Sequence, residues 1–286
     1  MDNRPLITLY TPGNRPDLIE KAGRFEPDGI VIDFEDAVPL DLKVRVRGEI
    51  AELLPKLDPS RAVLVRVNNR PDFLADDLAA IVGPHIYGVA LPMAEEPDQV
   101  REVDRAITRL ERERGLEPGS VRLLLLIETA LGVVRCFDLC RAAERVESVV
   151  FGSAEDGDLQ GDLHSAWSID GPEINYSRSR VLVEARAAGL PYVLDGAYSG
   201  IRDLEGLRAE SIISRRIGYD GRTLIHPSHV AVAREVYAPD PGEIDYYTRL
   251  IAAFEEAEKR GLAAITFEDK LVDYAMYKKA KVFLGV

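Results

Sequence analysis

The sequence has no long apolar run. No stretch reaches the roughly 18 consecutive apolar residues that a membrane-spanning helix needs, so we expect no membrane span. The first residues, Met1–Pro5, also lack the basic and apolar regions of a signal peptide. The sequence therefore predicts a cytoplasmic protein with no membrane partner.

Cysteine and positive charge are also scarce. The chain has two cysteines in 286 residues, Cys136 and Cys140, which is too few for a disulfide framework. They lie four residues apart on one face of a predicted helix. A redox or metal-binding pair is possible, and two buried thiols are the favoured interpretation. With 36 Lys and Arg against 49 Asp and Glu, the net charge is −13 and no basic block is present, so we expect no nucleic-acid partner.

Apolar runs recur along the first part of the chain at a steady spacing. Many are uninterrupted and β-branched, as in strands that are covered on both faces. Helical patterns such as Asp98–Arg114 and Pro172–Ala188 lie between them. Alternation of strands and helices predicts a parallel sheet, and eight repeats predict a closed (β/α)8 TIM barrel over residues 1–236. The eight runs are Leu6–Tyr10, Gly29–Phe34, Ala62–Val67, Gly88–Leu91, Leu123–Ile127, Val149–Phe151, Tyr192–Leu194 and Thr223–Ile225.

Residues 237–286 exceed what closing the barrel requires. They contain a long helical pattern, Glu243–Arg260, and a further segment, Ala263–Val286. We interpret them as a C-terminal helical extension. Two arrangements stay open from the sequence: the extension packs under its own barrel, or it reaches a neighbouring subunit.

Carboxylates follow two successive strands. Glu128 ends the fifth apolar run and Glu155-Asp156 follows the sixth, so an acid from each strand is expected at the C-terminal edge of the barrel, where active sites of this fold lie. Such a pair suits a hard cation, Mg²⁺ or possibly Mn²⁺, with water and substrate completing its shell. Asp158, in the same loop as Asp156, is a further candidate ligand. His226 has no second His or Cys at a suitable spacing for zinc.

Arg66 lies inside an apolar strand, where a lone charge is costly to bury. Its planar fork is suited to a carboxylate, which is either a structural partner such as Glu35 or Asp36, or a substrate. A metal next to this arginine would bind a 2-oxo or 2-hydroxy carboxylate and favour cleavage or formation of a carbon–carbon bond. Because no lysine follows a predicted strand directly, a Schiff-base mechanism is disfavoured.

Taken in order, the strand-end motifs resemble one known family, the citrate lyase β-subunit-like group of the HpcH/HpaI aldolase superfamily. The resemblance covers nearly the whole chain. It rests on Thr11–Pro16 (TPGNRP), Asp33–Val38 (DFEDAV), Arg66–Asn68 (RVN), Leu126–Thr129 (LIET), Phe151–Asp156 (FGSAED), Asp195–Tyr198 (DGAY), Arg202–Leu207 (RDLEGL) and Gly218–Pro227 (GYDGRTLIHP).

The resemblance implies a Mg²⁺-dependent lyase, commonly a homotrimer, that cleaves or condenses 3-hydroxyacyl-CoA thioesters such as citryl-, malyl- or citramalyl-CoA, or splits 2-oxo acids. It places the metal ligands at Glu128 and Asp156. It places the substrate-carboxylate arginine at Arg66, with the substrate-binding acids Glu35 and Asp36 nearby.

By the same resemblance, an aspartate from the C-terminal segment of a neighbouring subunit completes the site in several members. The matching residue is Asp273, a hypothetical proton donor. Leu6 and Met93 stand where the family usually has Arg and Lys, which favours one alternative, a CoA-independent metal-dependent 2-oxo acid aldolase. A non-catalytic subunit that binds metal and anion is the other alternative.

Overall fold

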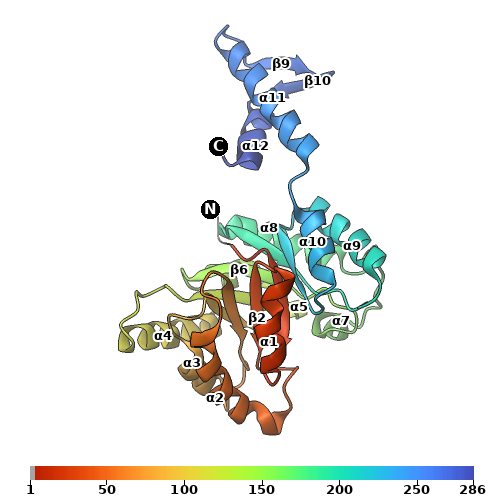
Figure 1. Cartoon of the computed structure of the whole chain (residues 1–286). Coiled ribbons are helices and arrows are strands. Elements are labelled where there is room, and N and C mark those ends of the chain that lie inside the picture. Colours follow the sequence, from red (N-terminus) through yellow and green to blue (C-terminus); the bar gives the residue numbers. More distant parts are fainter. Residues whose placement is uncertain (1–3) are drawn as a thin grey trace. The chain divides into compact units, whose positions relative to one another are not determined.

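The computed structural model describes residues 4–286; the first three residues of the segment judged not to be a signal peptide lie outside them. The chain divides into two compact units (Figure 1), one that ends at Tyr237 and one that covers Ala238–Val286. Within the described residues, no helix is both long and apolar enough to span a bilayer.

The first unit is a closed barrel of eight parallel strands in sequence order, with β1 pairing both β2 and β8. The predicted (β/α)8 barrel is therefore confirmed. Each strand overlaps a predicted apolar run. The strands are β1 (Ile7–Pro12), β2 (Gly29–Asp33), β3 (Ala62–Arg66), β4 (Gly88–Leu91), β5 (Arg122–Ile127), β6 (Val146–Phe151), β7 (Tyr192–Asp195) and β8 (Gly221–Leu224).

Helices between the strands cover the outside of the barrel. Helix α4 shows why they form: Pro97 occupies its first turn, and Val100, Val103, Ile107 and Leu110 recur at helical spacing on its buried face. The helices of this unit are α1 (Pro16–Ala22), α2 (Lys43–Leu53), α3 (Leu74–Ile81), α4 (Pro97–Glu113), α5 (Ala130–Val134), α6 (Cys136–Cys140), α7 (Asp158–Leu163), α8 (Asn175–Ala188), α9 (Leu204–Ile217) and α10 (His229–Tyr237).

The two cysteines lie on α6 as buried free thiols, with their Sγ atoms 3.9 Å apart. Their burial matches the favoured interpretation of the sequence. The hydrogen bond with the neighbouring Cys140 thiol and burial raise the pKa of Cys136, which keeps it protonated and unreactive.

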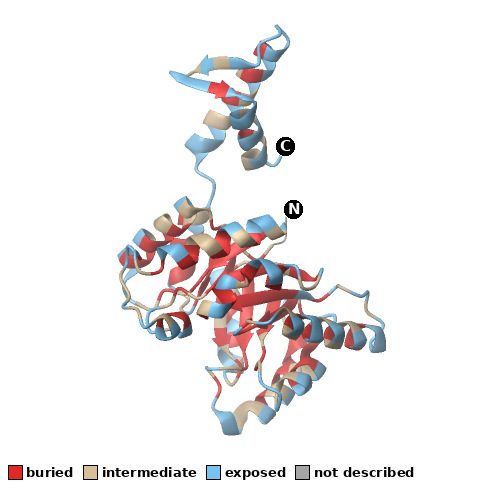
Figure 2. Ribbon diagram, turned by 180° about the vertical axis from the view of Figure 1, so that it is seen from behind, coloured by how far each residue is buried: buried red, intermediate tan, exposed pale blue. Residues whose placement is uncertain are grey.

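The barrel strands are largely buried (Figure 2), and their side chains form two apolar layers. One layer fills the space between strands and helices, and a smaller one, which includes Leu64, Leu126 and Val31, fills the barrel interior. Side chains alternate across a strand, so the next inward position after each of these three residues is i+2. Those positions are Arg66, Glu128 and Asp33, and the interior changes from apolar to charged at the C-terminal ends of the strands.

Behind β7 and β8, four buried charges form a network. The Glu210 carboxylate accepts from Arg178 Nη2 at 2.7 Å and from Arg222 Nη2 at 2.8 Å. Asp195 lies 3.4 Å from Arg178. Arg222 also donates to the Gly196 carbonyl at 2.7 Å, which ties the network to the loop that follows β7.

The second unit has a core of its own around Phe254 and Val272. It contains α11 (Pro241–Glu258), β9 (Ala264–Phe267), β10 (Lys270–Asp273) and α12 (Tyr274–Leu284). The antiparallel hairpin β9–β10 was not predicted, since the sequence suggested helices alone. Its two turn residues, Glu268 and Asp269, adopt left-handed backbone angles (φ 45° and 60°) without the glycine that usually marks such a turn.

We expect Glu210→Gln to lower the free energy of unfolding of the barrel unit by about 3–5 kcal/mol, because two buried arginines lose a shared counter-charge. Urea unfolding followed by circular dichroism would measure this. The matched control is Arg208→Ala on the same helix, whose ion pair with Glu235 is exposed and is expected to contribute far less. Equal stability of the two variants would show that the network does not hold the barrel together.

Candidate active site

A cavity of about 230 Å³ opens at the C-terminal ends of the barrel strands. Its lining includes Tyr10, Asp36, Arg66, Glu128 and Asp158. A larger groove of about 540 Å³ lies at the N-terminal ends of β5, β6 and β7. Active sites of this fold lie at the C-terminal face, so the smaller, charged cavity is the candidate site.

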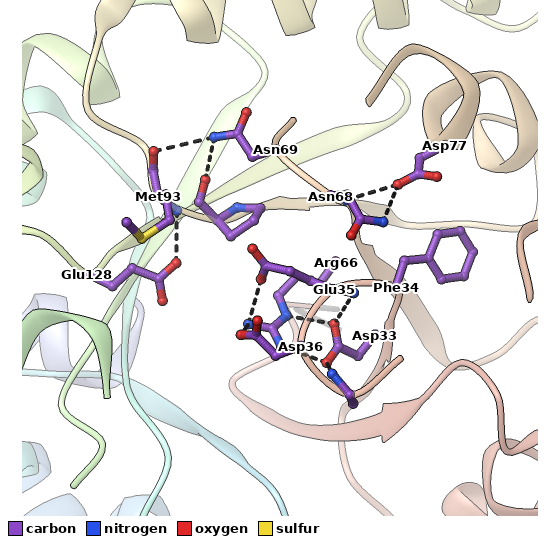
Figure 3. A network of polar contacts seen from close by, with 12 residues as sticks. Asp33, Phe34, Glu35, Asp36, Arg66, Asn68, Asn69, Asp77, Met93 and Glu128 are labelled. Carbon is purple, nitrogen blue, oxygen red and sulfur yellow. Dashed lines mark hydrogen bonds and ion pairs between the residues drawn. The ribbon is translucent and has the colours of Figure 1, made fainter. Parts of the chain in front are cut away.

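Glu128 is held at the end of β5 by backbone contacts. Its Oε1 accepts from the Met93 amide at 2.8 Å (Figure 3). Met93 has a left-handed backbone (φ 48°), uncommon for a non-glycine residue, and this conformation accompanies the amide's contact with the carboxylate. Gly152 packs against Glu128 so closely that a Cβ there would lie 2.6 Å from the Glu128 Cβ. The carboxylate therefore has a defined position before any ligand binds.

Arg66 is surrounded by carboxylates of the loop after β2. Asp33 accepts from Arg66 Nε at 2.8 Å and from Nη2 at 2.6 Å, a bidentate pair. Nη1 lies 2.8 Å from Glu35 and 3.3 Å from Asp36 (Figure 3). The structural partners that the sequence left open are thus present, and Asp33 is the closest of them.

One edge of the Arg66 guanidinium still has donor capacity. The group carries five N–H donors, and among the described residues only four contacts engage them. Among the residues that the structure describes, the second N–H of Arg66 Nη2 has no acceptor. The ring of Tyr10 lies against the guanidinium, with its centroid 5.3 Å from Cζ. Arg66 can therefore bind an anion through this N–H at the Nη1/Nη2 edge while Asp33 holds the adjacent Nε/Nη2 edge.

Lys43 supports the loop that carries Glu35 and Asp36, a role that was not predicted from the sequence. Its Nζ donates to the carbonyls of Phe34 and Glu35 and to Asn68 Oδ1, at 2.8, 2.6 and 2.6 Å. Burial lowers its pKa. The prediction concerned lysines that directly follow a strand, whereas Lys43 is the first residue of α2. Its three oxygen acceptors give it a structural role, which agrees with the disfavoured Schiff base.

Asn68 is fixed in turn by Asp77, which accepts from its backbone N at 3.0 Å and from Nδ2 at 2.8 Å (Figure 3). Arg47 closes this network from α2, because its Nε donates to Asp77 at 2.9 Å. Asp77 is buried and therefore needs these donors. The network links α2, α3 and the end of β3 behind the loop that carries Glu35 and Asp36.

Negative charge in and beside the cavity exceeds positive charge. Burial raises the pKa of Glu35 to about 8, although the nearby Arg66 lowers it. Burial also raises the pKa of Glu128 to about 7; the Met93 amide and Arg66 oppose the rise, and the charges of Asp158 and Asp36 add to it. A divalent cation would remove this penalty. The donor set therefore fits a hard cation.

The loop after β6 supplies the second acid. Asp158 lines the cavity at the start of α7, and its charge acts on Glu128. Asp156 and Asp158 are both exposed, but Asp156 has a left-handed backbone (φ 55°) and is not among the cavity-lining residues. The geometry thus favours Asp158, the alternative noted from the sequence, while a role for Asp156 stays a prediction.

No group of three or more His, Cys, Asp or Glu side chains that could hold a metal ion occurs in the described residues. Two carboxylates with water and substrate oxygens still meet the needs of Mg²⁺, which usually keeps several water ligands. Glu128 with Asp158 is such a pair.

Asp273 belongs to the second unit and not to the part of the chain that lines the cavity. Its Oδ1 accepts from the amides of Ala275 and Met276, at 2.9 and 3.3 Å, and so caps α12. The structure gives Asp273 a capping role, and its predicted catalytic role stays a prediction.

The barrel, the cavity and the carboxylate–arginine set can now be compared with known proteins. A family model described as HpcH/HpaI aldolase/citrate lyase matches residues 6–227, a range that contains all eight barrel strands. The chain belongs to the HpcH/HpaI aldolase/citrate lyase family. The resemblance inferred from the strand-end motifs is confirmed, and with it the prediction of a lyase.

Curated relatives of this HpcH/HpaI chain share about a third of its residues. Citrate lyase subunit beta of Leuconostoc mesenteroides subsp. cremoris is 34% identical over 275 residues, which is 96% of this chain and 90% of the relative. A (3S)-malyl-CoA thioesterase of Cereibacter sphaeroides is 34% identical over 267 residues, which is 93% of this chain and 88% of that protein.

A solved structure of the same kind is also similar. The protein CitE of Mycobacterium tuberculosis, in complex with magnesium, acetoacetate and coenzyme A, has a TM-score of 0.78 at 28% identity. The match covers 98% of this chain and 97% of that one.

We expect Asp158→Asn to weaken Mg²⁺ binding at least about tenfold, because the site loses one of two ligand charges, while Asp156→Asn changes the affinity less than about threefold. Isothermal titration calorimetry with MgCl₂ would measure both. Asn keeps the size of the side chain and removes only its charge, so each variant controls for the other. The reverse ranking would return the ligand role to Asp156.

Proposed function

We propose that this chain is a Mg²⁺-dependent carbon–carbon lyase that cleaves or forms a 3-hydroxyacyl-CoA thioester of the citryl-, malyl- or citramalyl-CoA kind. The observation that carries the proposal is that Glu128 and Arg66 line one cavity at the C-terminal face of the barrel. Magnesium, acetoacetate and coenzyme A in the similar Mycobacterium tuberculosis protein support it.

The proposed metal ligands are Glu128 and Asp158, with Asp156 as the alternative. Bound there, Mg²⁺ (or Mn²⁺) would supply positive charge to the substrate oxygens on which negative charge develops. The Met93 amide fixes one Glu128 oxygen, so the carboxylate need not reorganise when the site is filled.

Arg66 would bind the substrate carboxylate at its Nη1/Nη2 edge and orient the bond that breaks. Asp33 holds the guanidinium from the other edge, so the arginine can bind substrate without losing its position. Glu35 has a pKa of about 8 and is largely protonated at neutral pH, which lets it donate a hydrogen bond to an incoming carboxylate. Asp36 is 71% exposed and can move aside.

Two other reactions fit the same cavity. The similarity to a (3S)-malyl-CoA thioesterase favours hydrolysis of the thioester as a second candidate. The CoA-independent aldolase is the third, suggested by Leu6 and Met93. Neither Leu6 nor Met93 lines the cavity, but Leu6 packs with the barrel interior, whereas the Met93 amide contacts Glu128. Of these two positions, only Met93 therefore touches a residue of the site. Intact Glu128 and Arg66 count against the non-catalytic alternative.

The remaining parts of the proposal concern partners. A small carboxylate or acyl-CoA is the proposed substrate, with no nucleic acid and no membrane as partner. We keep the homotrimer and the cytoplasmic location as predictions. The same holds for the prediction that the extension contributes Asp273 to the site of a neighbouring subunit.

The product formed first from (S)-malyl-CoA with Mg²⁺ tests the reaction. We expect acetyl-CoA and glyoxylate, detected by chromatography, with a rate that falls at least about a hundredfold in Glu128→Gln because the metal loses a ligand charge. Malate with free CoA thiol would instead establish the thioesterase. Cleavage restricted to free 4-hydroxy-2-oxo acids would establish the CoA-independent aldolase.

Asp273→Asn tests the proton donor. Asn caps a helix about as well as Asp, so we expect unfolding stability to change by less than about 0.5 kcal/mol, while turnover falls by about a hundredfold if the carboxyl group donates a proton. The matched control is Asp240→Asn, the cap of α11 in the same unit, which should leave turnover unchanged. Full turnover in Asp273→Asn would restrict Asp273 to capping.

A further inference from the structure

Tyr10 differs from the other tyrosines of the barrel unit. In each of the others, the hydroxyl makes a hydrogen bond within the protein. These residues are Tyr87, Tyr176, Tyr192, Tyr198, Tyr219 and Tyr237. For Tyr10, no such contact exists among the described residues.

The Tyr10 hydroxyl is nevertheless not sealed inside the protein. Its oxygen is absent from the fully buried side-chain atoms without a partner, and the residue lines the cavity. A phenol oxygen that is not fully buried and makes no protein hydrogen bond is a donor available to a ligand.

The position of Tyr10 indicates which ligand atom it would meet. Its ring lies against the Arg66 guanidinium, 5.3 Å from Cζ, and both residues line the same cavity. An anion bound at the Nη1/Nη2 edge of Arg66 is therefore within the same part of the cavity as the phenol.

Tyr10 also remains a donor over the pH range in which the protein would work. Burial raises the pKa of Tyr10; Arg66 opposes the rise, and the charges of Asp33, Glu128 and Glu35 add to it. In these surroundings the phenol stays protonated near neutral pH, so it can donate a hydrogen bond to an anion and does not repel it.

We propose that Tyr10 is a substrate-binding residue whose hydroxyl donates a hydrogen bond to the carboxylate that Arg66 binds. This inference rests on the proposed function and adds a second, uncharged donor to its carboxylate site. The ligand class is a 2-oxo or 3-hydroxy acid with a free carboxylate. Because the contact is made in the bound ground state, Tyr10 governs affinity for the acid more than the rate of bond cleavage.

The test is Tyr10→Phe, which removes the hydroxyl and keeps the ring against Arg66. We expect the Kd for oxaloacetate at saturating Mg²⁺, measured by calorimetry, to rise about 10- to 100-fold, as for loss of a hydrogen bond to a charged group. KM for (S)-malyl-CoA should rise in parallel with this Kd, while kcat stays within about threefold of the wild-type value. Affinity for MgCl₂ alone should not change.

The matched control is Tyr87→Phe. Tyr87 packs against the same interior cluster as Tyr10, but its hydroxyl bonds to Glu147 within the protein. Tyr87→Phe should lower the melting temperature and leave the oxaloacetate Kd unchanged. Tyr10→Phe should leave the melting temperature unchanged and raise the oxaloacetate Kd. Tyr10→Leu, which also removes the ring from Arg66, should weaken oxaloacetate binding further than Tyr10→Phe.

Unchanged oxaloacetate affinity in Tyr10→Phe, or a loss of kcat with KM unchanged, would overturn the assignment. So would a wild-type protein that binds no oxaloacetate. Calorimetry measures binding and not cleavage, so the two proposals fail separately. A wild-type protein that binds oxaloacetate through Tyr10 but cleaves no acyl-CoA would overturn the lyase and leave the Tyr10 assignment standing.

Discussion

The bidentate pair between Asp33 and Arg66 is the interaction on which the candidate site depends. Asp33 accepts from two nitrogens of Arg66 and also from the amides of Glu35 and Ala37. One carboxylate thus shapes the loop after β2 and orients the guanidinium at the end of β3. An unpaired arginine at this depth would be costly to bury, and an unpaired aspartate would be equally so. The remaining carboxylates of this loop are arranged around the Arg66 guanidinium, whose position Asp33 already fixes.

Much of the fold and part of the site could be predicted from the sequence. Apolar runs between amphipathic helices predicted the barrel, since both signals arise from burial. Glu128 directly follows an apolar strand and Arg66 ends one, and the period of two brings them into one cavity. The helix of Lys43, the amide of Met93 and the hairpin after α11 were not predictable in this way. Each depends on loop geometry or on a backbone group, which leaves no side-chain pattern.

The acid of the β6 loop shows the same boundary between pattern and geometry. Glu155, Asp156 and Asp158 are all carboxylates that the sequence pattern alone does not rank, and the family resemblance pointed to Asp156. The path of the loop separates them: Asp158 starts α7 at the cavity wall, whereas Glu155 accepts a hydrogen bond from Ser199 at 2.8 Å. Family membership follows from the barrel motifs as a whole. Which of these acids is placed to bind a metal depends on the path of the loop, because Asp156 and Asp158 are only two positions apart. The order of the motifs along the chain does not distinguish them.

The amide of Met93 has a consequence for how this site can diverge. Glu128 is anchored by a main-chain group, so the anchor does not depend on which side chain stands at position 93. The left-handed backbone there costs about 1–2 kcal/mol for a residue with a Cβ, whichever one it is. Evolution or a protein engineer can therefore vary charge and bulk at position 93 without removing the main-chain contact to the Glu128 carboxylate. Substrate preference and metal geometry are separable traits in this scaffold.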